Sequence, residues 1–144
     1  MVALGLAGCG SGSPRVPDVG GLPLVGGTSV VAQARQCDAG ANAYCAVELV
    51  VVDPRLRSSD DLRKAERDRL VASGWSRTNG DTGNEFAADS PGHRLRVTYA
   101  TPQGDLQGID LGWIQRSRAI TLALSRALFA RSAALSMMLE RGSG

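Results

Sequence analysis

Hydrophobic and polar positions alternate along the middle of the chain in ways that predict two strands and one helix. Residues 46–52 form a short, β-branched apolar run that ends at Asp53-Pro54, which is typical of a buried strand. Residues 94–100 alternate between apolar and polar side chains, which predicts a strand with one buried face. Over residues 59–73, apolar side chains recur at helical spacing, which predicts an amphipathic helix.

Local signals mark both ends of the 59–73 helix. Ser58 stands three positions before Asp61, the spacing at which a capping side chain reaches the backbone of the first turn. At the other end, Gly74 can take the left-handed conformation that stops a helix. We therefore expect Trp75 to fold back onto the last turn and to be buried, because aromatic residues make up only 4% of the chain.

The rest of the chain adds weaker predictions. Residues 75–78 should begin a second strand, followed by a turn-rich loop. The 94–100 strand and residues 106–113 should form a hairpin joined by a turn at Pro102-Gln103-Gly104-Asp105. Residues 119–140 suit both strand and helix spacing, and we favour a strand over 119–124 followed by a helix over 126–140.

These elements predict an α+β domain at residues 37–144, with a mainly antiparallel sheet of four to five strands and two helices on one face. Residues 9–36 are rich in Gly, Pro and Ser and lack a lasting period, so we expect a flexible linker there. Within it, Gly26-Gly27-Thr28-Ser29 has neither the Lys nor the following helix of a phosphate-binding loop.

The first nine residues end in Leu6-Ala7-Gly8-Cys9. This tetrapeptide resembles the lipobox of bacterial lipoproteins, in which a peptidase cuts before a lipid-modified cysteine. The resemblance implies that residues 1–8 are a shortened signal-peptide remnant and that Cys9 carries the lipid. It also implies that the domain is anchored at the extracytoplasmic face of the cell membrane. The alternative is a chance occurrence of this tetrapeptide at a cytosolic start.

Cysteine usage agrees with export. If Cys9 carries a lipid, Cys37 and Cys45 remain as an even pair, separated by a short stretch of mainly small residues. Such a pair can close a disulfide in an oxidising compartment. Two unrelated buried thiols are the alternative. The spacing does not suit a metal site, and the chain has a single His.

The net charge and the positions of the arginines speak against nucleic-acid binding and against a membrane-associated C-terminal segment. The net charge is +2, which is too small to predict nucleic-acid binding. Fifteen of the sixteen basic residues are Arg, a bias that we attribute to codon usage in a GC-rich genome. Arg126 and Arg131 interrupt the apolar C-terminal stretch, so no transmembrane span is expected there. Arg131 also falls within the apolar stripe of that stretch, which speaks against a helix lying on a membrane surface.

No cluster of residues predicts a catalytic site, a cofactor or a metal. Asp89-Ser90-Pro91-Gly92-His93 contains the residue types of a hydrolytic triad, but five adjacent residues around Pro-Gly are far more typical of a turn. Glu48 and Asp110 fall within apolar segments, and we expect one of them to pair with Arg94 or Arg96 across the sheet.

Three residues remain as weak ligand candidates: Asp81, Glu85 and His93. Asp81, Asn84 and Glu85 lie in a Gly-containing loop, but their spacing does not match an EF-hand, so a solvated loop is favoured. The sequence therefore predicts an exported, lipid-anchored protein with a non-enzymatic domain. That domain would bind an envelope protein or a small ligand, or have a structural role. The alternative is a small extracytoplasmic hydrolase or transferase, which a cleft lined by perturbed acids would favour.

Overall fold

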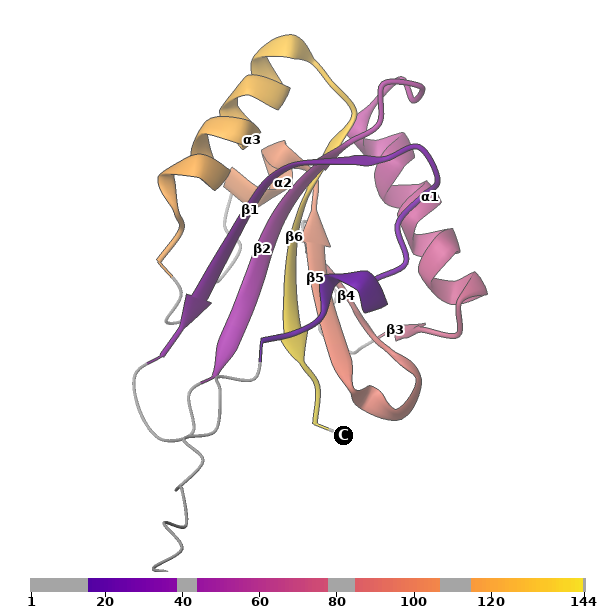
Figure 1. Ribbon diagram of the computed structural model, residues 1–144. Helices are drawn as coiled ribbons and strands as arrows, with labels where there is room; N and C mark the ends of the chain where they lie inside the picture. The colour runs from indigo at the N-terminus through magenta and orange to yellow at the C-terminus, as the bar shows by residue number, and fades with distance from the viewer. Residues whose placement is uncertain (1–15, 39–43, 78–84, 107–114, 144) are drawn as a thin grey trace, which may run out of the picture.

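One antiparallel sheet of six strands, in the order β1-β2-β6-β5-β4-β3, forms the centre of the domain (Figure 1). The computed structural model describes residues 16–38, 44–77, 85–106 and 115–143. The strands are β1 (Ser29–Cys37), β2 (Cys45–Val52), β3 (Ser76–Arg77), β4 (Phe86–Asp89), β5 (Leu95–Ala100) and β6 (Ala134–Arg141). The helices are α1 (Ser59–Ala72), α2 (Pro102–Leu106) and α3 (Arg118–Ala130), with two 3-10 turns, η1 (Val19–Gly21) and η2 (Pro91–His93). The predicted α+β class with an antiparallel sheet is confirmed.

Helices cover both faces of this sheet, so the prediction of two helices on one face is wrong. Alternate residues of β2 point in opposite directions. Val47, Leu49 and Val51 belong to the core that includes α1, whereas Val50 packs with Ile120 and Leu124 of α3. β2 is buried on both faces because it is covered twice, which also explains why its sequence is apolar at every position from Ala46 to Val52 except Glu48. Figure 1 shows the sheet between α1 and α3.

The sheet also has more strands than the predicted four to five, because the expected linker is partly folded. β1 pairs with β2 from Ser29 opposite Val52 to Cys37 opposite Cys45. Leu22 lies in the core beneath α1. The linker prediction is therefore wrong from about residue 19 onward. β1 is an edge strand in which no side chain is fully buried. Its half-buried positions alternate with exposed ones, but the apolar residues that pack toward α3 are the small Ala32 and Ala34, which give only a weak signal.

The order of elements at the C-terminus is the reverse of the prediction. Residues 118–130 form α3, and the following residues 134–141 form β6, which lies between β2 and β5. The helix buries Ile120, Leu124 and Ala127, which lie on one helical stripe. β6 is buried on both faces over most of its length, and such a strand cannot be distinguished from a helix by periodicity alone.

The predicted hairpin of residues 94–100 with 106–113 is also wrong. β5 confirms the first strand, but it is flanked by β4 and β6, so no other strand can pair with it. Residues 102–105, expected as a turn, and Leu106, expected as the start of a strand, form α2. The turn-rich loop expected at 79–84 and most of 106–113 lie outside the described residues.

The prediction for α1 and its ends is confirmed. The Ser58 hydroxyl accepts a hydrogen bond from the Asp61 amide at 3.1 Å. Gly74 has a φ of 84°. The amides of Gly74 and Trp75 donate to the carbonyls of Val71 and Leu70, respectively, which is the Schellman pattern. The chain reversal places Trp75 in the core, where it is 5% exposed.

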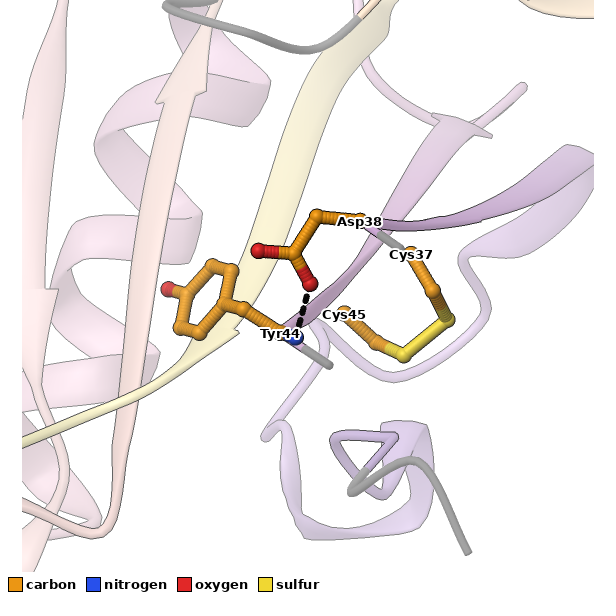
Figure 2. The surroundings of a disulfide bond; sticks show 4 residues. All are labelled: Cys37, Asp38, Tyr44 and Cys45. Carbon is orange, nitrogen blue, oxygen red and sulfur yellow. Dashed lines mark hydrogen bonds between the residues drawn. A yellow bond between two sulfur atoms is a disulfide. The ribbon is translucent and has the colours of Figure 1, made fainter. Parts of the chain in front are cut away.

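A disulfide closes the β1–β2 hairpin, as predicted. Cys37 and Cys45 are bonded where β1 ends and β2 begins (Figure 2). Beside them, two hydrogen bonds link Asp38 and Tyr44. The Asp38 amide donates to the Tyr44 carbonyl, and the Tyr44 amide donates to the Asp38 carboxylate. The covalent bond and these two hydrogen bonds hold the same end of the hairpin.

Candidate functional site

The candidate ligands from the sequence are not brought together by the fold. Cys9, Asp81 and Asp110 lie outside the described residues. Glu85 precedes β4 and His93 follows it, so these two residues stand at opposite ends of that strand. His93 is largely exposed, and its Nδ1 lies 3.5 Å from an oxygen of Asp89. Glu85 and His93 therefore do not form a common site.

Ser90 has a structural role in the turn between β4 and β5. Its hydroxyl accepts a hydrogen bond from the Leu95 amide at 2.9 Å, and its own amide donates to the Leu95 carbonyl at 2.9 Å. Ser90 is buried, and a serine nucleophile must be accessible to its substrate. This geometry confirms the interpretation of residues 89–93 as a turn.

Three charged side chains from different parts of the chain, Glu48, Asp105 and Arg116, form a cluster beside the sheet. Glu48 comes from β2, Asp105 from α2 and Arg116 from the segment before α3. Both acids are buried. Arg116 Nη2 lies 3.0 Å from Asp105 Oδ2 and Nη1 contacts Asp105 Oδ1, while Nε lies 3.3 Å from Glu48 Oε2. A single guanidinium thus neutralises parts of two buried carboxylates.

The sequence predicted that Glu48 or Asp110 pairs with Arg94 or Arg96. Glu48 pairs with Arg116 instead, and Asp110 lies outside the described residues. Burial raises the pKa of Glu48, and the nearby Arg116 opposes that rise. The other oxygen of Glu48, Oε1, is buried and has no hydrogen-bond partner among the described residues. Sequence spacing gave no signal for this pairing, because Glu48 and Arg116 are 68 residues apart.

A second polar group lies on the same face of the sheet. Glu140 of β6 stands opposite Ala46 of β2 and opposite Arg96 of β5. Burial raises the pKa of Glu140, and Arg96 opposes this shift. Burial and a hydrogen bond with Glu140 raise the pKa of Tyr44 to about 12. Tyr44 therefore stays protonated and can donate its hydroxyl hydrogen to Glu140.

On the opposite face, Glu66 of α1 is buried without a salt-bridge partner among the described residues. Its Oε2 accepts a hydrogen bond from the Val25 amide at 3.0 Å, whereas Oε1 is buried without a partner. Burial raises the pKa of Glu66 to about 7, although the Val25 amide and the charge of Arg69 oppose the shift. This carboxyl ties the segment before β1 to α1, a contact that the sequence did not reveal.

A groove of about 500 Å³ runs between the start of α1, the start of α2 and the end of α3. Its charged lining residues are Arg57, Asp60 and Arg131. Hydrogen bonds from Lys64 and Arg63 lower the pKa of Asp60, so this acid stays ionised. The groove therefore contains no carboxyl with the raised pKa that a general acid needs at neutral pH.

No protein-family model, no curated protein and no solved structure matches this chain. Among the described residues, no three His, Cys, Asp or Glu side chains are grouped so that they could hold a metal ion. Within the same part of the chain, no helix is long and apolar enough to cross a membrane.

Proposed function

We propose that this protein is an exported lipoprotein, anchored to the cell membrane through Cys9, whose small domain is a non-catalytic binding or structural module of the envelope. The observation that carries the proposal is the pairing of the cysteines. Cys37 and Cys45 are bonded to each other, so the third cysteine of the chain is the one that ends the lipobox-like Leu6-Ala7-Gly8-Cys9. A structural disulfide is typical of proteins that fold outside the cytosol.

The arrangement of the buried charges supports a non-catalytic domain. The buried acids Glu48 and Asp105 share Arg116, and buried Asp53 binds Arg55 at 2.8 Å. Hydrogen bonds from Arg55 hold the pKa of Asp53 below its usual range. Glu48 and Asp105 hold β2 and α2 to the segment before α3 through Arg116. Asp53 holds Arg55, which donates a hydrogen bond to the Gly26 carbonyl. These are structural tasks. A hydrolase would instead expose a nucleophile or a base in a cleft.

Fractionation of cells tests the lipid anchor. The chain is expressed behind a complete signal sequence, with Cys9 and as Cys9→Ser. We expect the Cys9 form in the membrane fraction and Cys9→Ser outside it, because a serine cannot form the thioether to the lipid. Mass spectrometry of the N-terminal peptide should show the added lipid on Cys9 only. If both forms are recovered in the same fraction and no lipid is found, the anchor does not exist.

A further inference from the structure

The outer face of α3 carries apolar side chains where a surface helix normally carries polar ones. Ile120, Leu124 and Ala127 form the buried side of this helix. Leu122 and Phe129 fall on the opposite side at 3.6 residues per turn. They are 43% and 94% exposed. The helix therefore has apolar side chains on two sides, and only one of these sides packs on the sheet.

The charged residues of α3 and of the position that follows it are all cationic. Arg118, Arg126 and Arg131 are exposed, and none of them makes an ion pair with another described residue. Residues 115–133 contain no Asp or Glu, so all fourteen acidic residues lie elsewhere in a chain of net charge +2. By contrast, the exposed positions of α1 mix both signs, and Asp60 there pairs with Arg63 and Lys64. α3 thus differs from α1 in carrying cations without acids among them.

The position and the charge of this surface indicate which kind of partner it can bind. α3 lies on the outside of the sheet, against β1 and β2 (Figure 1). A second copy of the chain docked face to face would place arginines against arginines, which like-charge repulsion opposes. An anionic lipid surface can bind both the exposed apolar side chains and the arginines. The apolar side chains enter the boundary of the acyl chains, and the arginines contact the phosphates.

We propose that the outer face of α3, formed by Arg118, Leu122, Arg126 and Phe129, binds the surface of an anionic lipid membrane. The helix lies in the plane of the headgroups. The sequence placed Arg131 within an apolar helical stripe, which spoke against binding at a membrane surface, but in the structure Arg131 lies outside the helix. α3 ends at Ala130, and Arg131 is the residue with left-handed backbone that follows it. This binding does not require a lipid on Cys9.

Vesicle co-sedimentation tests the proposal. The full chain is used as Cys9→Ser, so that no lipid anchor contributes and the result is independent of the proposed lipoprotein function. We expect it to sediment with vesicles made of equal parts of phosphatidylglycerol and phosphatidylcholine. It should remain in the supernatant with vesicles of phosphatidylcholine alone. Binding should also weaken at about 0.5 M NaCl, where exposed charges are screened.

Two sets of variants locate the binding face. Phe129→Ser should weaken binding to the anionic vesicles by about tenfold, the loss expected when one large apolar side chain no longer enters the lipid. The pair Arg118→Gln and Arg126→Gln should weaken it by a similar factor. The matched controls are Val71→Ser, an exposed apolar residue of α1, and the pair Arg35→Gln and Arg69→Gln, exposed on β1 and α1.

Several outcomes overturn the proposal. A parent that binds neither kind of vesicle has no membrane site on α3, and an acidic protein then becomes the partner to seek. Equal binding to both kinds of vesicle refutes the role of the arginines. Equal losses in the control variants place the binding elsewhere. Thermal melts of all variants establish that they are folded, as expected for changes at exposed positions.

Discussion

At the residue scale, Glu66 is a group whose ionisation destabilises the folded protein. It is fully buried on α1, and only one of its two carboxyl oxygens has a hydrogen-bond donor. In the unfolded chain this carboxyl is solvated and has the ordinary pKa of a glutamate, whereas burial raises it to about 7 in the fold. The folded protein therefore favours the protonated form. Its stabilising contribution is complete below the unfolded pKa and is lost as the pH rises through about 7.

We predict that Glu66→Gln removes this pH dependence. The amide is neutral at every pH and can still accept the Val25 hydrogen bond through its oxygen. At pH of about 5 the variant and the parent should unfold with similar free energies. At pH of about 8 the variant should be more stable, by up to about 3 kcal/mol, since each pKa unit corresponds to about 1.4 kcal/mol. Denaturant titrations at the two pH values measure this difference.

Glu48 and Glu140 also have raised pKa values, but they are present in both proteins, so their contributions cancel in the comparison. Asp68→Asn is the control, because Asp68 is an exposed acid of the same helix. It should leave the pH profile of the parent unchanged. A Glu66→Gln variant that follows the parent's profile would mean that Glu66 is ionised in the folded protein without cost.

At the element scale, the β1–β2 hairpin depends on a covalent bond in addition to its ladder. β1 lies at the edge of the sheet and is paired on one side only. Its side chains are largely exposed, so it contributes little apolar burial of its own. The Cys37–Cys45 bond compensates by shortening the loop that the unfolded chain must close.

We predict that removing this bond lowers the free energy of unfolding by about 2–3 kcal/mol, the chain-entropy value for so short a loop. The measurement is denaturant unfolding of the parent and of the variant Cys37→Ala with Cys45→Ala. Reductant should lower the stability of the parent to about that of the variant and should not affect the variant itself. Unchanged stability of a parent whose two thiols are shown by alkylation to be reduced would contradict the prediction.

Elements with local signals were predictable from the sequence, and those defined by distant contacts were not. α1 has its capping residues and its glycine stop within the segment itself, and the burial of Trp75 follows from that stop. α3 and β6 were interchanged because a strand covered on both faces loses its alternation. β1 is difficult to predict because its inward apolar residues, Ala32 and Ala34, are small, and its pairing with β2 is what defines it.

The same distinction applies to the candidate site. The pairing of Cys37 with Cys45 follows from their spacing in a short loop. The partners of Glu48 and Glu66 do not, because each lies more than 40 positions away along the chain. Exposure of Phe129 also depended on the observed helix register. Its neighbours in sequence, Leu128 and Ala130, give no reason to expect an aromatic side chain in solvent.

At the scale of the whole molecule, the sheet carries two different layers. On the face covered by α1 the packing is largely apolar and forms the larger core. The face covered by α3 has a smaller apolar cluster and a set of buried charges. Arg116, which lies just before α3 begins, links this second layer to the sheet. It binds Glu48 in β2 and Asp105 in α2.

We predict that Arg116→Met destabilises the protein by about 3–5 kcal/mol, because it leaves two buried carboxylates without their cation. Arg118→Met is the matched control. It removes the same charge two positions away but from an exposed side chain, so its effect should stay within about 0.5 kcal/mol. Denaturant unfolding compares the two variants.

A rescue experiment separates lost charge balance from lost packing. In the Arg116→Met background, Glu48→Gln and Asp105→Asn remove the two uncompensated charges while keeping the size of the side chains. Stability should then recover in large part, because a neutral buried amide costs less than a buried carboxylate. If the rescue fails, Arg116 acts through the packing of its aliphatic chain. If Arg116→Met and Arg118→Met unfold at the same denaturant concentration, the two carboxylates are solvated in the folded protein and the cluster does not join the layers.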